Sequence, residues 1–88
     1  MSSSPLESSG APDDGSPAKA AKLIGEVDKL EKRVDRENLS ADDSQRDILA
    51  QKLLTEAKVA LAQRDGVAAM SLATKASTLL APLPKLAD

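Results

Sequence analysis

Residues 40–66 read SADDSQRDILAQKLLTEAKVALAQRDG, a stretch with the signals of a helix start at one end and of a helix stop at the other. It opens on Ser40 and two acids, a pattern typical of a helix start, because the hydroxyl caps free backbone N–H groups and the acids face the positive end of the helix dipole. Its apolar residues recur at helical spacing on a broad face that suits contact with two neighbours. They are Ile48, Leu49, Leu53, Leu54, Ala57, Ala60 and Leu61.

The same stretch closes on Arg64-Asp65-Gly66. Gly66 is expected to adopt the left-handed conformation that ends a helix. Asp65 is expected to cap the helix that follows. We therefore predict a helix over residues 41–64, with one further helix on each side of it.

The segment before this stretch predicts a helix over residues 17–38. Ser16 is placed to cap it, and Pro17 is tolerated at the first helical position. Apolar residues then recur at alternating spacings of three and four, which is a heptad seam. The candidate interface residues on this seam, named here the N-terminal seam, are Leu23, Val27, Leu30 and Val34. Two interpretations stay open: the seam is intramolecular core, or it binds a partner or a second copy of the chain.

The segment after it predicts a helix over residues 67–81, which Pro82 and Pro84 terminate. Residues 82–88 are expected to form a short irregular tail in which Leu83 and Leu86 fray. Short corners place successive helices antiparallel. We expect an all-α fold, a small antiparallel three-helix bundle over residues 17–81; the alternative is a helical hairpin that dimerises.

Residues 1–16 differ in composition from the rest of the chain. Ser, Gly and Pro dominate, and the only sizeable apolar side chains are Met1 and Leu6. Such a segment cannot bury enough apolar surface to offset its ordering entropy, so we expect a disordered arm or tether. About 65 residues then remain for a core, which is near the lower limit for independent folding.

The composition excludes several classes of protein. The net charge is -2, with 12 basic and 14 acidic side chains, and there is no aromatic residue. A nucleic-acid partner is therefore not expected, since neither a basic footprint nor base-stacking rings are present. No apolar run has the length of a membrane span, and no stretch has the pattern of a secretory leader. The absence of Cys leaves the compartment open between the cytoplasm and the periplasm or cell envelope.

Residue types that carry catalysis are scarce. There is no His and no Cys, and the one superficial nucleophile pair is Ser71 with Lys75, one helical turn apart. An exposed lysine is a cation at neutral pH and a poor base, so we interpret this pair as a polar strip. The acidic pairs Asp13-Asp14 and Asp42-Asp43 fit an arm and a helix cap. We expect no catalytic, cofactor or metal site, and no enzyme activity.

The leading hypothesis is a non-enzymatic protein–protein interaction or scaffold module, with an unidentified protein partner or self-association. An adaptor, docking or secretion-chaperone element is an alternative. Both follow from capped Ala- and Leu-rich helices under a surface of mixed charge.

Two family resemblances add further expectations. Residues Lys52–Pro82 resemble a single tetratricopeptide-type helix pair, with small residues at Ala57, Ala69 and Ala76. The run Leu-x-x-Ala-x-x-Ala-Leu-Ala-x-Arg-Asp-Gly at Leu54–Gly66, behind a Ser-rich tether, resembles the helical hairpins of small bacterial cell-envelope lipoproteins. That resemblance implies the mature region of a lipoprotein with a structural or accessory role. It implies a membrane tether only where a lipidated Cys precedes the arm.

Overall fold

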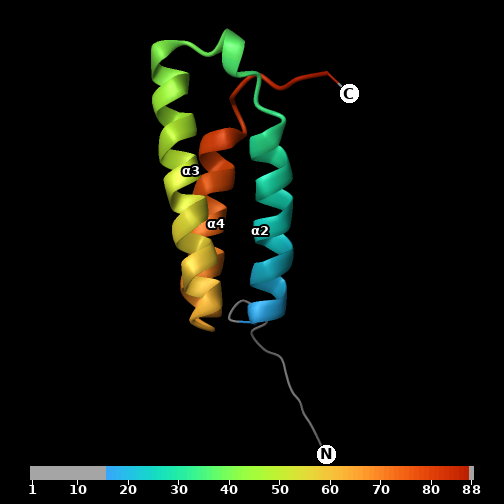
Figure 1. Cartoon of the computed structure of the whole chain (residues 1–88), viewed down its shortest axis with the longest axis vertical. Helices are drawn as coiled ribbons and strands as arrows, with labels where there is room; N and C mark the ends of the chain where they lie inside the picture. The colour runs from blue at the N-terminus through green and yellow to red at the C-terminus, as the bar shows by residue number, and fades with distance from the viewer. Residues whose placement is uncertain (1–15, 88) are drawn as a thin grey trace, which may run out of the picture.

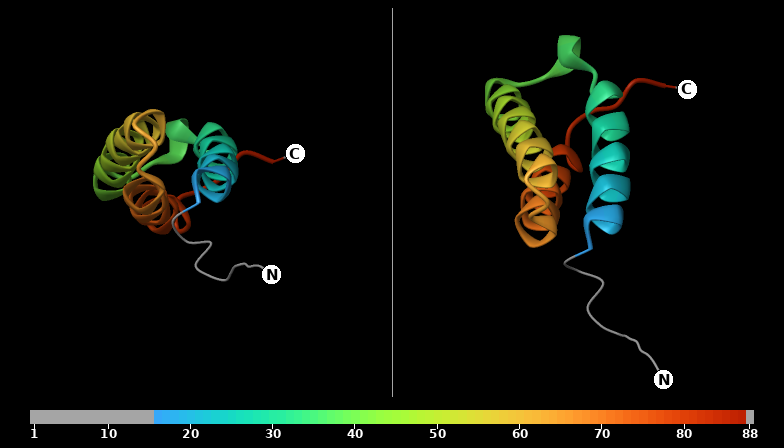
Figure 2. Two further views of the ribbon diagram at one scale, coloured as in Figure 1. Left: turned by 90° about the horizontal axis from the view of Figure 1, so that it is seen from below. Right: turned by 60° about the horizontal axis from the view of Figure 1, so that its bottom comes forward.

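The computed structural model describes residues 16–87, which form three long helices and one short one. These are α2 (Pro17–Lys32), the 3-10 helix η2 (Arg36–Asn38), α3 (Ala41–Ala62) and α4 (Gly66–Leu80). Figure 1 shows α4 behind the gap between α2 and α3, and the end-on view in Figure 2 places the three at the corners of a triangle. The predicted all-α three-helix bundle is confirmed. The predicted arm lies outside the described residues, except for Ser16.

Helices α2 and α3 begin at the residues that the sequence predicts, and α4 begins one residue earlier than predicted. The Ser40 hydroxyl accepts a hydrogen bond from the Asp43 N–H at 3.1 Å, and the Asp65 carboxylate accepts one from the Ala68 N–H at 3.1 Å. Ser16 stands at the N-cap of α2, but its side chain makes no capping bond. Pro17 follows it, and because proline has no N–H, this start has one donor fewer to satisfy.

The corner between α3 and α4 differs from its prediction. The left-handed residue is Arg64, with φ 64°, and the prediction for Gly66 is wrong because Gly66 is the first residue of α4. The Asp65 N–H donates to the Ala60 carbonyl at 2.9 Å, and the Arg64 N–H donates to the Leu61 carbonyl at 2.9 Å. This is a Schellman closure. Because Asp65 caps α4, the chain must reverse one residue before it.

Helix α2 ends at Lys32, so the predicted end at residue 38 is wrong. The chain beyond it pairs with the C-terminal tail instead. The Asp35 N–H donates to the Pro84 carbonyl at 2.9 Å, and the Leu86 N–H donates to the Arg33 carbonyl at 2.6 Å. These bonds replace intrahelical ones, and they flank an isolated antiparallel bridge between Val34 and Lys85.

The tail after α4 is irregular but firmly packed. Leu83 is buried in the core at 3 % exposure, so the expectation that it frays is wrong, whereas Leu86 is half exposed. The Lys85 ammonium donates to the carbonyls of Leu80, Ala81 and Leu83. A cation bonded to the last carbonyls of a helix stabilises its negative end. The tail therefore closes α4 and covers the end of α2.

The core is built mostly from small side chains. The inward face of α4 repeats every three or four residues, and α3 supplies a matching set of small residues. Small side chains let helix backbones approach closely, and α4 packs most extensively against α3. The buried residues of these two helices are Gly66, Ala69, Ala73, Ala76 and Leu80 on α4, and Asp47, Ala50, Leu54, Ala57 and Ala60 on α3.

Candidate functional site

An open groove runs between α3 and α4 on the outside of the bundle. Its volume is about 360 Å³, and we name it the α3/α4 groove. Leu49 is 46 % exposed, and Leu53 and Leu79 are half-buried. An exposed apolar strip of this kind indicates a contact site, because single exposed leucines are ordinary but grouped ones mark surfaces that bind. The lining residues are Leu49, Leu53, Thr74, Lys75, Thr78 and Leu79.

The groove follows from how the two helices share their apolar residues. On α3, Leu54 and Ala57 face the core, so Leu49 and Leu53 fall at the edge of the same broad face. On α4, Ala76 and Leu80 are buried, and Leu79 lies at the edge of that buried face. The buried alanines between α3 and α4 are small, so they leave open the space between Leu49, Leu53 and Leu79 at the surface. The result is an apolar channel with polar threonines on its α4 side.

One charge stands at the groove, and a second hollow adjoins it. Lys75 is the only charged lining residue, and it makes no ion pair or hydrogen bond with the rest of residues 16–87. The adjoining hollow, of about 260 Å³, is lined by Asp42, Gln45, Arg46 and Leu49. Leu49 belongs to both. The accessible surface therefore continues along α3 from its first turn into the α3/α4 groove.

The N-terminal seam lies elsewhere. Val27 and Val34 are each 2 % exposed, in the core, while Leu23 and Leu30 are partly buried and pack against it. Val34 reaches the core from the segment after α2 rather than from the helix. The two valines of the seam are therefore core residues, whereas the two leucines keep part of their surface accessible.

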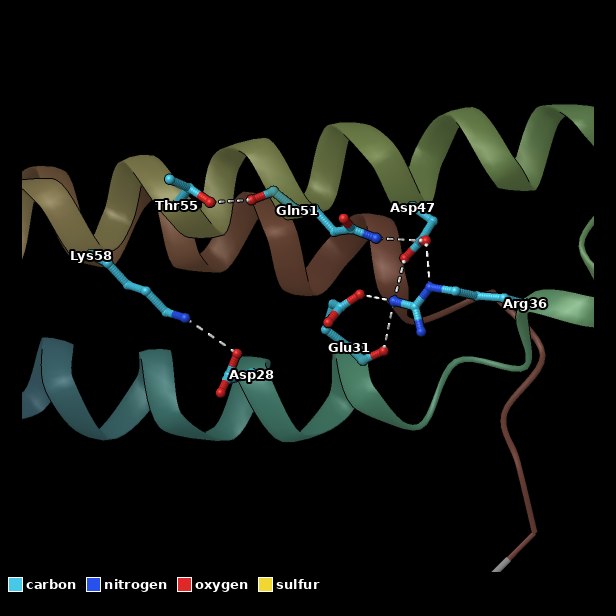
Figure 3. A network of polar contacts seen from close by, with 7 residues as sticks. All are labelled: Asp28, Glu31, Arg36, Asp47, Gln51, Thr55 and Lys58. Carbon is cyan, nitrogen blue, oxygen red and sulfur yellow. Dashed lines mark hydrogen bonds and ion pairs between the residues drawn. The ribbon is translucent and has the colours of Figure 1, made fainter.

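A polar network joins α2, η2 and α3 at one end of the bundle (Figure 3). Asp47 is the one buried charged residue among those described, at 4 % exposure. The Arg36 Nε donates to Asp47 Oδ2 at 3.2 Å, and Gln51 Nε2 donates to the same oxygen at 2.9 Å. The Arg36 guanidinium also forms an ion pair with Glu31 and donates to the Glu31 carbonyl. A buried carboxylate needs such partners, so this network is structural.

A second charged contact links α2 and α3. Lys58 Nζ on α3 lies 3.3 Å from Asp28 Oδ1 on α2, and Lys32 Nζ lies 3.4 Å from Asp28 Oδ2. Burial raises the pKa of Asp28, but Lys58 and Lys32 together outweigh it and hold that pKa below its ordinary value. The Lys58–Asp28 contact connects α2 and α3, the pair of long helices that touch least.

The residues considered for catalysis are not assembled into a centre. Ser71 and Lys75 are both exposed on α4. The Asp43 carboxylate accepts a hydrogen bond from Arg46 Nη1 at 2.8 Å, and the Asp43 N–H donates to the Ser40 hydroxyl that caps the helix. The pair Asp13-Asp14 lies outside the described residues. Residues 16–87 hold no group of three or more His, Cys, Asp or Glu placed to bind a metal. None of the described helices combines the length and apolar character that crossing a bilayer requires.

Comparisons with known proteins return no relative. No family model, curated protein or solved structure matches this chain.

Sequence reasoning missed the α3/α4 groove. The signal was available in Leu49 and Leu53, which belong to a broader apolar face than one neighbouring helix can cover. What the sequence did not reveal is which of the leucines would stay exposed. The exposure of each leucine depends on where α4 docks, and α4 docks through its small buried residues Ala69, Ala73 and Ala76.

Proposed function

We propose that this chain is a non-enzymatic protein-docking module and that the α3/α4 groove is its docking surface. The observation that carries the proposal is the grouping of Leu49, Leu53 and Leu79 along an open groove. Burying such side chains contributes roughly 1.5–3 kcal/mol each when they pass fully from water into an apolar contact. A partner that covers this strip would be bound through the free energy of burying these apolar side chains.

The shape of the groove favours a macromolecule over a small ligand. Small-molecule sites enclose most of their ligand and aim a few fixed polar groups into it. Here none of the six lining residues is buried, and the polar ones are exposed threonines and a lysine. An amphipathic helix laid along the groove suits this arrangement, because its apolar face would meet the leucines while its polar face stays in water.

The surrounding framework supports a scaffold role. The corners are closed by capping side chains, and the tail is tied to the end of α2 by backbone hydrogen bonds. A rigid helix pair presents its side chains in one arrangement, which lowers the entropy lost on binding. The module would therefore offer a preformed surface.

The experiment is site-specific photo-crosslinking in cells of the source organism. A photoreactive residue replaces Leu49 in the groove, and in a matched control it replaces Val59, which is exposed to a similar extent at 53 % on the same helix. We expect a discrete protein adduct from position 49 that is absent from position 59 and is lost when Leu53→Asp is added. Equal labelling at both positions, or none at position 49, contradicts the proposal.

A further inference from the structure

Helix α3 carries a second heptad stripe on its accessible side. Its spacings alternate four, three, four, three, so its members fall within about a quarter of the helix circumference. The stripe borders the α3/α4 groove and includes its two α3 leucines. We name it the α3 stripe; its residues are Asp42, Arg46, Leu49, Leu53 and Glu56.

The α3 stripe is complementary to a second, antiparallel copy of itself. Leu49 and Leu53 each lie two residues from position 51, and Arg46 and Glu56 each lie five residues from it. Two α3 helices that run antiparallel about that level therefore place leucine against leucine and arginine against glutamate, twice over. Such self-complementarity is what a two-fold symmetric interface requires.

The charges of the α3 stripe are accessible for this pairing. The Arg46 side chain is 49 % exposed, and its contact with Asp43 uses one donor of a guanidinium that has five. Glu56 is exposed and makes no ion pair with any of residues 16–87. Glu56 of one copy and Arg46 of the other are thus complementary across the two-fold axis of the dimer.

We infer that the α3/α4 groove is occupied by a second copy of this chain, with the two α3 helices packed antiparallel along their α3 stripes. This inference rests on the proposed function and names its partner. The stripe spans 15 residues, about 22 Å of helix, which is a modest contact. Interfaces at the small end of the range give weak, reversible dimers, so we expect a dissociation constant of roughly 10–100 µM.

Sedimentation equilibrium of the purified chain between about 5 µM and 1 mM tests the inference. We expect a reversible monomer–dimer equilibrium that Leu49→Asp abolishes and that Val59→Asp leaves unchanged, because Val59 is exposed on α3 outside the α3 stripe. Arg46→Glu and Glu56→Arg should each weaken the dimer roughly tenfold, since each introduces two like-charge contacts. The double variant Arg46→Glu with Glu56→Arg should restore the wild-type affinity. Circular dichroism of each variant confirms that it is folded.

A wild type that stays monomeric at 1 mM overturns the inference, and so does a dimer that Leu49→Asp does not affect. A double charge reversal that fails to restore affinity overturns the antiparallel register. These outcomes are separable from failure of the proposed function. A monomeric chain that still crosslinks from position 49 to a different protein retains the docking surface and loses only the second copy. Absence of crosslinks together with absence of a dimer removes both.

Discussion

Arg36 on η2 reaches across to α3 and places its Nε 3.2 Å from Oδ2 of Asp47. The two residues are eleven positions apart and belong to different elements, with the corner at Ser40 between them. Because the guanidinium also pairs with Glu31 on α2, one side chain connects all three elements. The relationship fixes how the chain turns from α2 into α3.

Arg36→Met is expected to destabilise the bundle by about 2 kcal/mol. The substitution keeps most of the aliphatic stem but leaves the buried Asp47 carboxylate with Gln51 as its remaining side-chain partner. The value is below that of a fully buried pair because the Arg36 side chain is 44 % exposed. Urea denaturation at neutral pH measures the change. Arg46→Met, which removes an exposed pair with Asp43, is the control and should cost no more than about 0.5 kcal/mol. Equal losses in the two variants would contradict the special role of Asp47.

Asp28→Asn is expected to lower stability at neutral pH but not in strong acid. The folded pKa of Asp28 lies below 3.8, so the carboxylate contributes stability above that value and the contribution is lost as the pH falls through the folded pKa. The difference between wild type and variant should therefore shrink from about pH 4 downward. Urea titrations at pH 7, 4 and 3 follow it. Lys58→Met should reproduce part of the loss at neutral pH, and a difference that grows in acid would refute the assignment.

Gly25→Ala is expected to stabilise the chain by about 0.5–1 kcal/mol. Gly25 lies inside α2 and is exposed, and a Cβ at this position meets no other atom within 4 Å. Alanine thus restricts the unfolded chain and favours the helix without a steric cost. Thermal unfolding detects the gain. The matched control is Ala21→Gly, an exposed site on the same helix, which should lower stability by a similar amount. A destabilising Gly25→Ala would mean that α2 does not hold its helical geometry there.

Leu83→Ala is expected to cost about 2–3 kcal/mol, because it empties a buried position in the core. Leu86→Ala, three residues further along and 50 % exposed, should change stability by no more than about 0.5 kcal/mol. Chemical denaturation of both variants tests whether the tail is part of the folded unit. A Leu83→Ala protein as stable as the Leu86→Ala protein would mean that the tail is dispensable.

Local sequence signals predicted the structure correctly at the helix starts, where a single residue provides the cap. Ser40 and Asp65 are short polar residues followed by helix formers, and both cap where they were predicted to. The corner at Gly66 was assigned to the wrong residue because glycine is the usual left-handed residue. The bonds of the Schellman closure, with Asp65 already used as a cap, require Arg64 instead.

Contacts between residues far apart in the chain account for the larger differences between the predicted and the observed structure. Residues 33–38 contain no Gly or Pro, so nothing local indicates that α2 stops at Lys32. The partners that replace its helical bonds, Pro84 and Leu86, are about fifty residues away in the chain. The same holds for the network around Asp47, because Arg36 and Asp47 are eleven residues apart and lie on different elements.

The spacing of apolar residues and the capping residues predict three helices and two of their capped starts, because spacing and capping act within one or two helical turns. The docking of the helices buries Val27 and Val34 of the N-terminal seam, holds Leu83 in the core, and leaves Leu49, Leu53 and Leu79 along an open groove. Burial is a property of how helices dock, and docking depends on contacts between residues far apart in the chain. The amphipathic pattern of α3 specifies an apolar face, but the position of α4 decides which part of that face remains for a partner.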